Sequence, residues 1–218
     1  MLKTKDLGYW YDNPKNSLFE NVNLEFEAGQ SYAIVGQSGS GKTTFLSLIA
    51  GLDKPKSGSI EFEGKDIGQI GLTNYRKKDV SIIFQSYNLF TYMSPLNNLL
   101  TAMAITESSH TGDKAFAADM LRKLGLTDEQ MKQNVQQLSG GQQQRVAIAR
   151  TMVCDARLVV ADEPTGNLDE DNTAEVIELF QQIAHEQHKC VVIVTHELTV
   201  ANACDNAYRL EKHEFSVI

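Results

Sequence analysis

Four short apolar runs rich in Val and Ile stand out in the hydrophobic pattern of the chain, at residues 32–35, 80–84, 158–161 and 191–194. Uninterrupted apolar runs of this length are typical of parallel strands that are buried on both faces. Three of them lead directly into chemically distinctive residues: a glycine-rich loop, Asp162-Glu163 and Thr195-His196. Because ligands bind beyond the carboxyl ends of parallel strands, we expect these segments to meet at one site.

Helical patterns occupy much of the remaining chain. Apolar residues recur at helical spacing between positions 171 and 188, which predicts an amphipathic helix that covers the sheet and connects the last two strands. Residues 86–152 carry helix signals without strands, including 115–124 and a helix after Ser139, and predict an inserted helical subdomain. The first thirty residues alternate imperfectly, which indicates edge strands or a small antiparallel sheet; the relevant positions are Leu18, Val22, Leu24 and Phe26.

These patterns together predict an α/β fold in one domain spanning residues 1–218. It would have a parallel sheet, an N-terminal antiparallel β subdomain and the helical insertion. A chain of 218 residues and 24.2 kDa is long enough to bury such a core.

Composition narrows the classes of function. A net charge of −8 lacks the basic field that binds nucleic-acid phosphates, so no nucleic-acid partner is expected. No run of about 18 apolar residues and no signal-peptide core is present, which indicates a cytosolic location. The three cysteines form no CxxC pair, as is typical of reduced, buried thiols.

The glycine-rich loop has the sequence Gly36-Gln-Ser-Gly-Ser-Gly-Lys-Thr43, which fits the P-loop pattern and lies between a predicted strand and a predicted helix. Glycines let backbone amides surround phosphates, and the following helix presents its positive end to them. Lys42 would neutralise the β and γ oxygens, and Thr43 could hold Mg²⁺.

The run Leu158-Val-Val-Ala-Asp-Glu163 ends in two carboxylates, as expected of the acidic partner of a P-loop. Asp162 would hold Mg²⁺ through its water shell, and Glu163 would polarise the attacking water. Two carboxylates at a strand end are also ordinary surface chemistry, and the P-loop decides between the two interpretations.

The segment Leu138-Ser-Gly-Gly-Gln142 places Ser139 and two glycines at a helix start, with Ser139 as its cap. Such a start can form a second anion site. Taken alone, an ordinary helix N-terminus is the better interpretation.

With these segments in view, the sequence resembles the ABC ATPases over nearly its whole length. The P-loop, Gln85 of a Q-loop, the signature at 138–142, the Asp162-Glu163 strand end, a D-loop at 167–169 and the switch histidine His196 occur in the family's order and spacing. The resemblance implies one nucleotide-binding domain of the P-loop NTPase (RecA-like) class over residues 1–218. In this family ATP lies between the P-loop of one subunit and the signature of another, so that one chain would hold two half-sites.

The resemblance also implies roles for individual residues. Glu163 is the base, His196 senses the γ-phosphate, Gln85 links the γ-phosphate and Mg²⁺ to the helical subdomain, and an N-terminal aromatic, Tyr11 or failing that Tyr9, stacks on adenine. The metal would be held by Thr43, Gln85 and Asp162. The remaining nucleotide-binding residues implied are Gly36, Ser38, Gly39, Ser40, Gly41, Lys42, Thr43, Thr44, Ser139, Gly140, Gly141 and Gln142.

The phrase Ala161-Asp-Glu-Pro-Thr-Gly-Asn-Leu-Asp169 is similar to the bacterial group that serves lipoprotein release, macrolide and peptide export and antimicrobial-peptide resistance. This group implies a homodimer that works with a separate integral-membrane permease, at the cytoplasmic face of the bacterial cell membrane. Residues 93–98 depart from the Thr-Val-x-x-Asn stretch usual in relatives, which indicates an adapted permease-facing surface.

Two other functions compete with transport. ABC ATPases that act on nucleic acid or ribosomes usually carry two cassettes or a long coiled coil, whereas only 95 residues separate Lys42 from Leu138 here. A nucleotide switch without hydrolysis would not need both Glu163 and His196. His185 and His188 are three apart on a predicted helix, but without further ligands nearby we expect solvated positions rather than a metal site.

Overall fold

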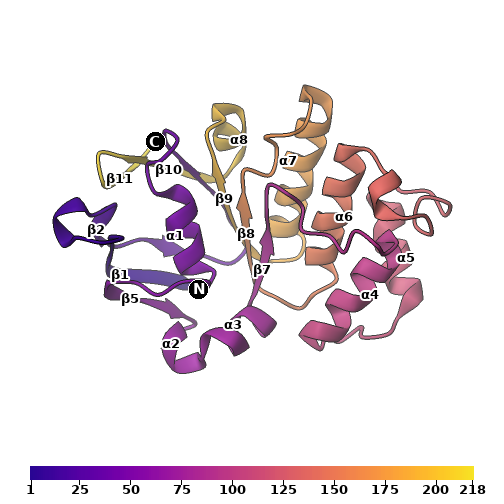
Figure 1. Cartoon of the computed structure of the whole chain (residues 1–218), viewed down its shortest axis with the longest axis horizontal. Helices are drawn as coiled ribbons and strands as arrows, with labels where there is room; N and C mark the ends of the chain where they lie inside the picture. The colour runs from indigo at the N-terminus through magenta and orange to yellow at the C-terminus, as the bar shows by residue number, and fades with distance from the viewer.

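The computed structural model describes residues 1–218 apart from the side chain of Glu170. Its larger sheet has six strands in the order β11-β10-β4-β9-β8-β7 (Figure 1). Neighbouring strands run parallel except for the β10-β11 pair. The six strands are β4 (Ser31–Val35), β7 (Val80–Ile83), β8 (Leu158–Asp162), β9 (Cys190–Thr195), β10 (Asn206–Glu211) and β11 (Glu214–Val217). The four predicted strands are confirmed, while β10 and β11 were not predicted.

The central strands β8 and β9 are buried on both faces, which explains their continuous apolar runs. Successive side chains alternate between two hydrophobic clusters: Val160 and Val192 point into one, and Val159 and Val191 into the other. The first cluster contains helix α1 (Lys42–Ile49), and the second contains helix α7 (Glu170–His185). The sheet is therefore held between these helices, and its carboxyl edge is fixed in place by both cores.

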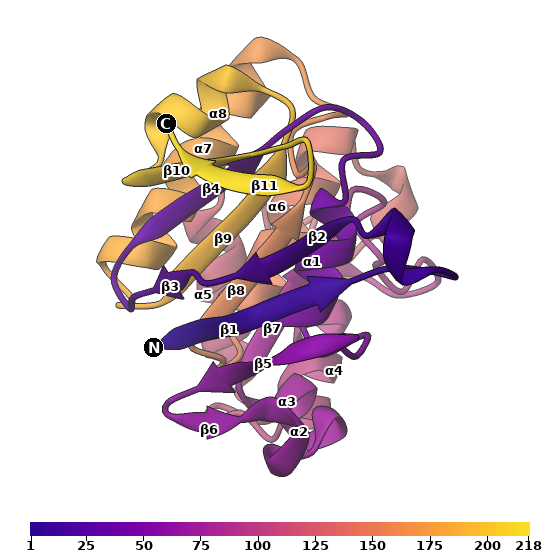
Figure 2. The same ribbon diagram turned by 90° about the vertical axis from the view of Figure 1, so that its left-hand side faces the viewer.

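A second, antiparallel sheet covers α1 on the side away from the parallel sheet (Figure 2). The prediction of an N-terminal antiparallel sheet is confirmed, but β5 and β6 were not predicted. In β5 only Ile60 and Phe62 are buried, so the run is too short and too polar to stand out in the sequence. The strands are β1 (Leu2–Tyr9), β2 (Phe19–Val22), β3 (Glu25–Phe26), β5 (Ser57–Phe62) and β6 (Lys65–Asp66).

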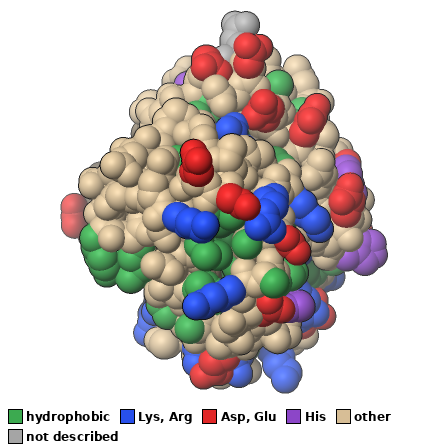
Figure 3. Space-filling view, turned by 90° about the vertical axis from the view of Figure 1, so that its right-hand side faces the viewer, with side chains coloured by type: hydrophobic (Ala, Val, Ile, Leu, Met, Phe, Trp, Pro, Cys, Tyr) green, Lys and Arg blue, Asp and Glu red, His purple; other side chains and the backbone are tan. Residues whose placement is uncertain are grey.

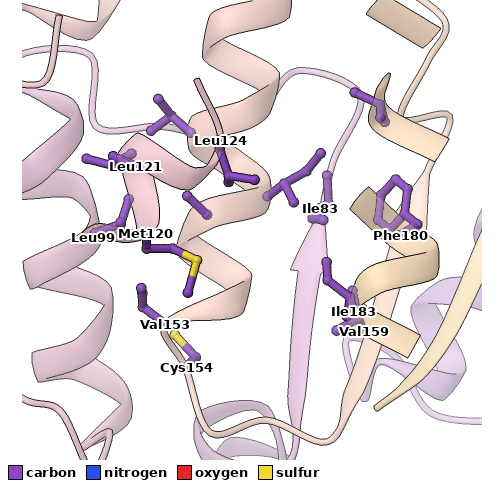
Figure 4. Close-up of a cluster of buried hydrophobic side chains, with 14 of the residues drawn as sticks. Ile83, Leu99, Met120, Leu121, Leu124, Val153, Cys154, Val159, Phe180 and Ile183 are labelled. Atoms are coloured by element: carbon purple, nitrogen blue, oxygen red, sulfur yellow. The ribbon is translucent and has the colours of Figure 1, made fainter. Parts of the chain in front are cut away.

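Residues 95–152 form helices α4 (Pro95–Thr106), α5 (Lys114–Lys123) and α6 (Gly140–Met152), as the helical pattern predicts. Their apolar faces share one buried cluster with β7, β8 and α7 (Figure 4). Leu99, Leu121 and Val153 thus contact the same core as Phe180. Shorter helical segments are η1 (Pro14–Asn16), α2 (Ile67–Ile70), α3 (Leu72–Lys78), η2 (Val135–Gln137) and α8 (Leu198–Ala203).

Among the described residues, no helix is long and apolar enough to cross a membrane. The three cysteines are free; Cys154 and Cys190 are buried, and Cys204 is partly buried. His185 and His188 are exposed, and His185 Nε2 lies 2.9 Å from Asp205 Oδ2. The described residues contain no group of three or more His, Cys, Asp or Glu that could hold a metal ion.

Candidate nucleotide-binding site

A cavity of about 700 Å³ opens beside α1, at the carboxyl ends of the parallel strands. It joins the loop after β4 to side chains that follow β7, β8 and β9, as the sequence predicts for the ends of neighbouring parallel strands. Its walls are formed by Tyr11, Leu18, Ser38, Gly39, Gly41, Lys42, Thr43, Thr44, Gln85, Glu163 and His196.

The P-loop forms the floor of this cavity. Gly41 precedes α1 with φ of 104°, a left-handed conformation that favours glycine, and none of the described side chains caps the helix. Gly36 has no room for a side chain, because a Cβ there would lie 2.5 Å from the Leu210 carbonyl oxygen. The amides of an uncapped helix start carry partial positive charge, so this floor suits an anion.

Lys42 supplies the full positive charge. Its side chain is only 6% exposed, and its ammonium group donates hydrogen bonds to the carbonyl oxygens of Gly36 (2.8 Å) and Gln37 (3.1 Å). A buried cation bonded to carbonyls rather than to a carboxylate retains its net charge for a ligand. Nearby, the Ser40 hydroxyl is buried and has no hydrogen-bond partner among the described residues.

Asp162 lies at the end of β8 beside the P-loop helix, where the Thr43 hydroxyl donates a 3.2 Å hydrogen bond to its Oδ1. Burial, and to a lesser extent the neighbouring Glu163 carboxylate, raise the pKa of Asp162, while the Thr43 hydrogen bond and Lys42 oppose them. Asp162 and Gln85 also border a smaller neighbouring cavity. Carboxylate, hydroxyl and amide oxygens are the ligands that Mg²⁺ prefers, so this donor set fits that ion.

Glu163 and His196 are in direct contact at the wall of the cavity. Glu163 Oε2 lies 2.9 Å from His196 Nδ1 and accepts a longer hydrogen bond, 3.3 Å, from the His196 backbone N–H. The Glu163 backbone is left-handed, with φ of 45°, which typically costs a residue other than glycine about 1 kcal/mol or more. Its N–H donates to the Val194 carbonyl oxygen of β9, which holds this conformation in place.

The two candidate aromatics have different surroundings. Tyr11 is 62% exposed, lines the cavity and shares a 2.9 Å hydrogen bond with the Thr44 hydroxyl. Tyr9 is only 6% exposed and does not line the cavity. Of the two, only Tyr11 has a free ring surface at the site.

The signature residues lie elsewhere, at the start of α6, and none of the side chains described as lining the cavity belongs to them. The Ser139 hydroxyl accepts from the Gln142 N–H at 3.3 Å, and the Gln142 side chain accepts from the Ser139 N–H at 2.9 Å. Gly141 is buried against Asn172, and Gly140 faces the Tyr87 hydroxyl. Within one chain, the P-loop site and the signature are therefore separate.

Two residues at the site were not predicted to be site residues from the sequence. Leu18, expected only as a strand residue, lines the cavity and lies against Gly41. Asn167, expected only as part of the D-loop, donates a 3.3 Å hydrogen bond from its side chain to the Gln85 carbonyl oxygen. No local sequence signal marks either contact, because the partners are 23 and 82 residues away in the chain.

Comparison with known proteins gives the same assignment for most of the chain. Residues 19–166 match the ABC transporter family. The ABC transporter ATP-binding protein YclH of Bacillus subtilis is 51% identical over 217 residues, covering 100% of this chain and 96% of YclH. The macrolide export ATP-binding/permease protein MacB of Nitrosomonas europaea is 41% identical over 87% of this chain, which spans 29% of MacB.

A solved structure is similar over the whole chain. The ATP-binding cassette MJ0796, in a dimeric post-hydrolysis state bound to ADP and Pi, superimposes with a TM-score of 0.86 at 30% identity, covering 100% of this chain and 98% of that one. The fold of this structure matches the fold predicted from the sequence. The chain belongs to the ABC transporter family and is an ATP-binding, ATP-hydrolysing member of it.

Proposed function

We propose that this chain hydrolyses ATP, with Mg²⁺, to drive export or mechanical work through a separate membrane permease at the cytoplasmic face of a bacterial membrane. One observation carries the proposal: a single cavity joins the P-loop, Gln85, Glu163 and His196, while the signature faces elsewhere. Similarity to the whole length of YclH supports a separate ATP-binding chain, and similarity to part of MacB supports a permease partner.

Residues of the P-loop hold the triphosphate. The backbone amides from Gly39 to Thr44 surround the phosphates, and the buried Lys42 ammonium exchanges its carbonyl partners for phosphate oxygens. Tyr11 presents its exposed ring to the adenine base. Aromatic stacking of this kind contributes about 1 kcal/mol beyond the buried area.

Thr43, Asp162 and Gln85 would hold Mg²⁺, which supplies positive charge to the phosphate oxygens when it is bound. Asp162 and Thr43 already lie within hydrogen-bond distance of each other. The buried position of Asp162 raises the pKa of its carboxyl group in the free protein, and a nearby cation would favour its ionised form.

Glu163 accepts the proton of the attacking water. One of its carboxylate oxygens is engaged by His196, so the other is available to the water. His196 thereby orients the base and lies at the cavity wall, where it can contact the terminal phosphate. A positioned base of this kind typically contributes about 10²–10⁴ in rate.

The second half-site comes from a second copy of the chain. Ser139 and Gly141 at the start of α6 face the γ-phosphate held by the partner's P-loop, in a head-to-tail homodimer that closes around two ATP molecules. The dimeric state of the similar cassette MJ0796 supports this arrangement. It also explains why the signature helix start lies outside the cavity of its own chain.

The test is the Glu163→Gln variant, which keeps the shape of the site but removes the proton acceptor. We expect hydrolysis to fall by about 10²–10⁴ while ATP binding survives, so that the closed dimer accumulates by mass action. Light scattering after size exclusion should show a monomer without nucleotide and a dimer with ATP. Glu178→Gln, on the exposed face of α7, is the matched control. Full hydrolysis by Glu163→Gln would exclude Glu163 as the base.

The permease docks, we propose, on the face formed by α4 and the loop before it. A shallow groove there is lined by Met93, Asn97, Leu100, Thr101, Ala104 and Ile105. Tyr92 is 73% exposed and Ile105 is 58% exposed. On this side of the molecule, hydrophobic side chains lie among Lys and Arg (Figure 3).

Charged substitution of Tyr92 tests this surface. We expect Tyr92→Glu to abolish co-purification with the permease while the isolated subunit binds ATP normally. The same replacement at Tyr11 should have the opposite effect, weakening ATP binding without breaking the complex. Unchanged co-purification of Tyr92→Glu would place the docking face elsewhere.

A further inference from the structure

We infer that Tyr9 and Asp53 are positioning residues that hold the Tyr11 ring at the spacing from the P-loop that an adenine nucleotide requires. The inference rests on the proposed role of Tyr11 as the ring on which the adenine base stacks, called the base platform below. It adds a determinant of nucleotide affinity that lies behind the platform rather than in contact with the nucleotide.

Packing against the protein covers only part of the Tyr11 side chain. Its side chain is 62% exposed, and an exposed ring that samples several rotamers must lose that freedom when a base stacks on it. The Tyr9 ring meets it at right angles, with centroids 5.4 Å apart and planes 86° apart. This edge-to-face geometry is favourable between aromatic rings and supports one orientation of Tyr11.

Tyr9 is in turn fixed by an acidic partner. It ends strand β1, is 6% exposed, and its hydroxyl donates a 2.6 Å hydrogen bond to Asp53 Oδ2. The Lys56 ammonium lies 5.7 Å from the centre of the Tyr9 ring on another side. The hydrogen bond to Asp53, with burial, raises the pKa of Tyr9 to about 12, so the hydroxyl remains a donor at neutral pH.

Tyr11 and Asp53 are both hydrogen-bonded to helix α1. Tyr11 shares its hydrogen bond with Thr44 in the first turn of α1, and Asp53 lies just beyond the last turn, where its N–H donates to the Ser47 carbonyl oxygen. The start of α1 is the phosphate cradle, so the aromatic pair is tied to both ends of the element that binds the phosphates. The distance between base platform and phosphates is thereby set before the nucleotide arrives.

The experiment compares ADP with pyrophosphate by calorimetry in the presence of Mg²⁺. ADP lacks the γ-phosphate around which the proposed dimer closes, and pyrophosphate lacks the base. We expect Tyr9→Phe, which removes only the bond to Asp53, to weaken ADP binding by about three- to tenfold, the usual value of one such hydrogen bond, and to leave pyrophosphate binding unchanged. Asp53→Asn should act in the same direction. In steady-state kinetics the KM for ATP should rise while kcat stays constant.

A double-mutant cycle separates this inference from the role of Tyr11 itself. In a Tyr11→Leu background, Tyr9→Phe should have no further effect on ADP binding. The matched control is Tyr32→Phe, another buried tyrosine, whose hydroxyl accepts from the Glu27 N–H at a distance from the cavity; its ADP affinity should be unchanged.

Two results would overturn the inference alone: unaltered ADP binding in Tyr9→Phe, or equal weakening of ADP and pyrophosphate binding, which would indicate a general structural role. If Tyr11→Leu itself binds ADP normally, the proposed base platform is wrong and the positioning role fails with it.

Discussion

The starts of helices α1 and α6 are both glycine-rich, and they differ in how their amides are satisfied. At α1, Gly41 takes a left-handed conformation, no side chain that the structure describes caps the helix, and the buried Lys42 ammonium lies beside it. At α6, Ser139 and Gln142 cap each other's backbone N–H groups in a reciprocal capping box. The first start is open to a ligand in the single chain, and the second is already stabilised without one.

In the proposed dimer, these two helix starts would lie on opposite sides of a shared site. The open start of α1 would bind nucleotide in an isolated subunit. The capped start of α6 would contribute only when a partner brings a phosphate to it, and its own side chains stabilise the helix without a ligand. We therefore expect substitutions at the start of α1 to weaken nucleotide binding by one subunit, and substitutions at the start of α6 to affect nucleotide binding only in the dimer.

The largest expected effects come from Lys42→Ala and Ser139→Arg. Both should abolish ATP hydrolysis, but only Lys42→Ala should weaken ADP binding by the single subunit, by about 10- to 100-fold for the loss of charge-assisted hydrogen bonds. Mixing the two inactive proteins should restore hydrolysis, because a mixed dimer has one composite site with both Lys42 and Ser139 intact. A mixture as inactive as its components would contradict the head-to-tail arrangement.

An intermediate effect on stability and hydrolysis is expected at the contact between α6 and the segment that follows Gln85. The Arg150 guanidinium, at the far end of α6, donates to the carbonyl oxygens of Asn88 (2.6 Å) and Tyr87 (3.0 Å). Tyr87 and Asn88 follow Gln85 closely and are both left-handed, with φ of 61° and 46°. Arg150 is partly buried, and this burial lowers the pKa of its guanidinium group.

Arg150→Met should therefore lower Tm by about 3–6 °C through the lost hydrogen bonds to a strained turn. Its ATP hydrolysis should fall while ADP binding stays near that of the parent, since the P-loop is untouched. Arg122→Met is the control, because Arg122 pairs with Asp119 and Asp128 on an exposed face and such pairs contribute little. Equal melting temperatures for the two variants would remove Arg150 as a connecting residue.

The smallest expected effect is on thermal stability, where alanine substitutions of Ser139 and Ser40 should differ. Ser139→Ala removes a helix cap and should cost about 1 kcal/mol, or about 2–4 °C in Tm. Ser40→Ala removes a buried hydroxyl that has no partner in the part of the chain that the structure describes, so the free protein should keep its stability or gain slightly. Thermal melts without nucleotide measure both, and a larger loss in Ser40→Ala than in Ser139→Ala would reverse the comparison.

Much of this protein could be predicted from its sequence because the relevant signals are local. Buried parallel strands require continuous apolar runs, so β4, β7, β8 and β9 were visible directly. The P-loop is a contiguous motif in which the glycines are required sterically and the lysine electrostatically. Most of its residues line the cavity. The amphipathic pattern of α7 was likewise a local signal.

Only the tertiary structure decided the contacts between distant segments. The order of strands in the sheets, the hydrogen bond between Glu163 and His196, and the choice of Tyr11 over Tyr9 as the residue exposed at the cavity all depend on packing across many residues of chain. The bond between Tyr9 and Asp53 joins residues 44 positions apart and has no sequence signature. The sequence determines which side chains the protein has, and the packing of both sheets around α1 determines which of them come into contact.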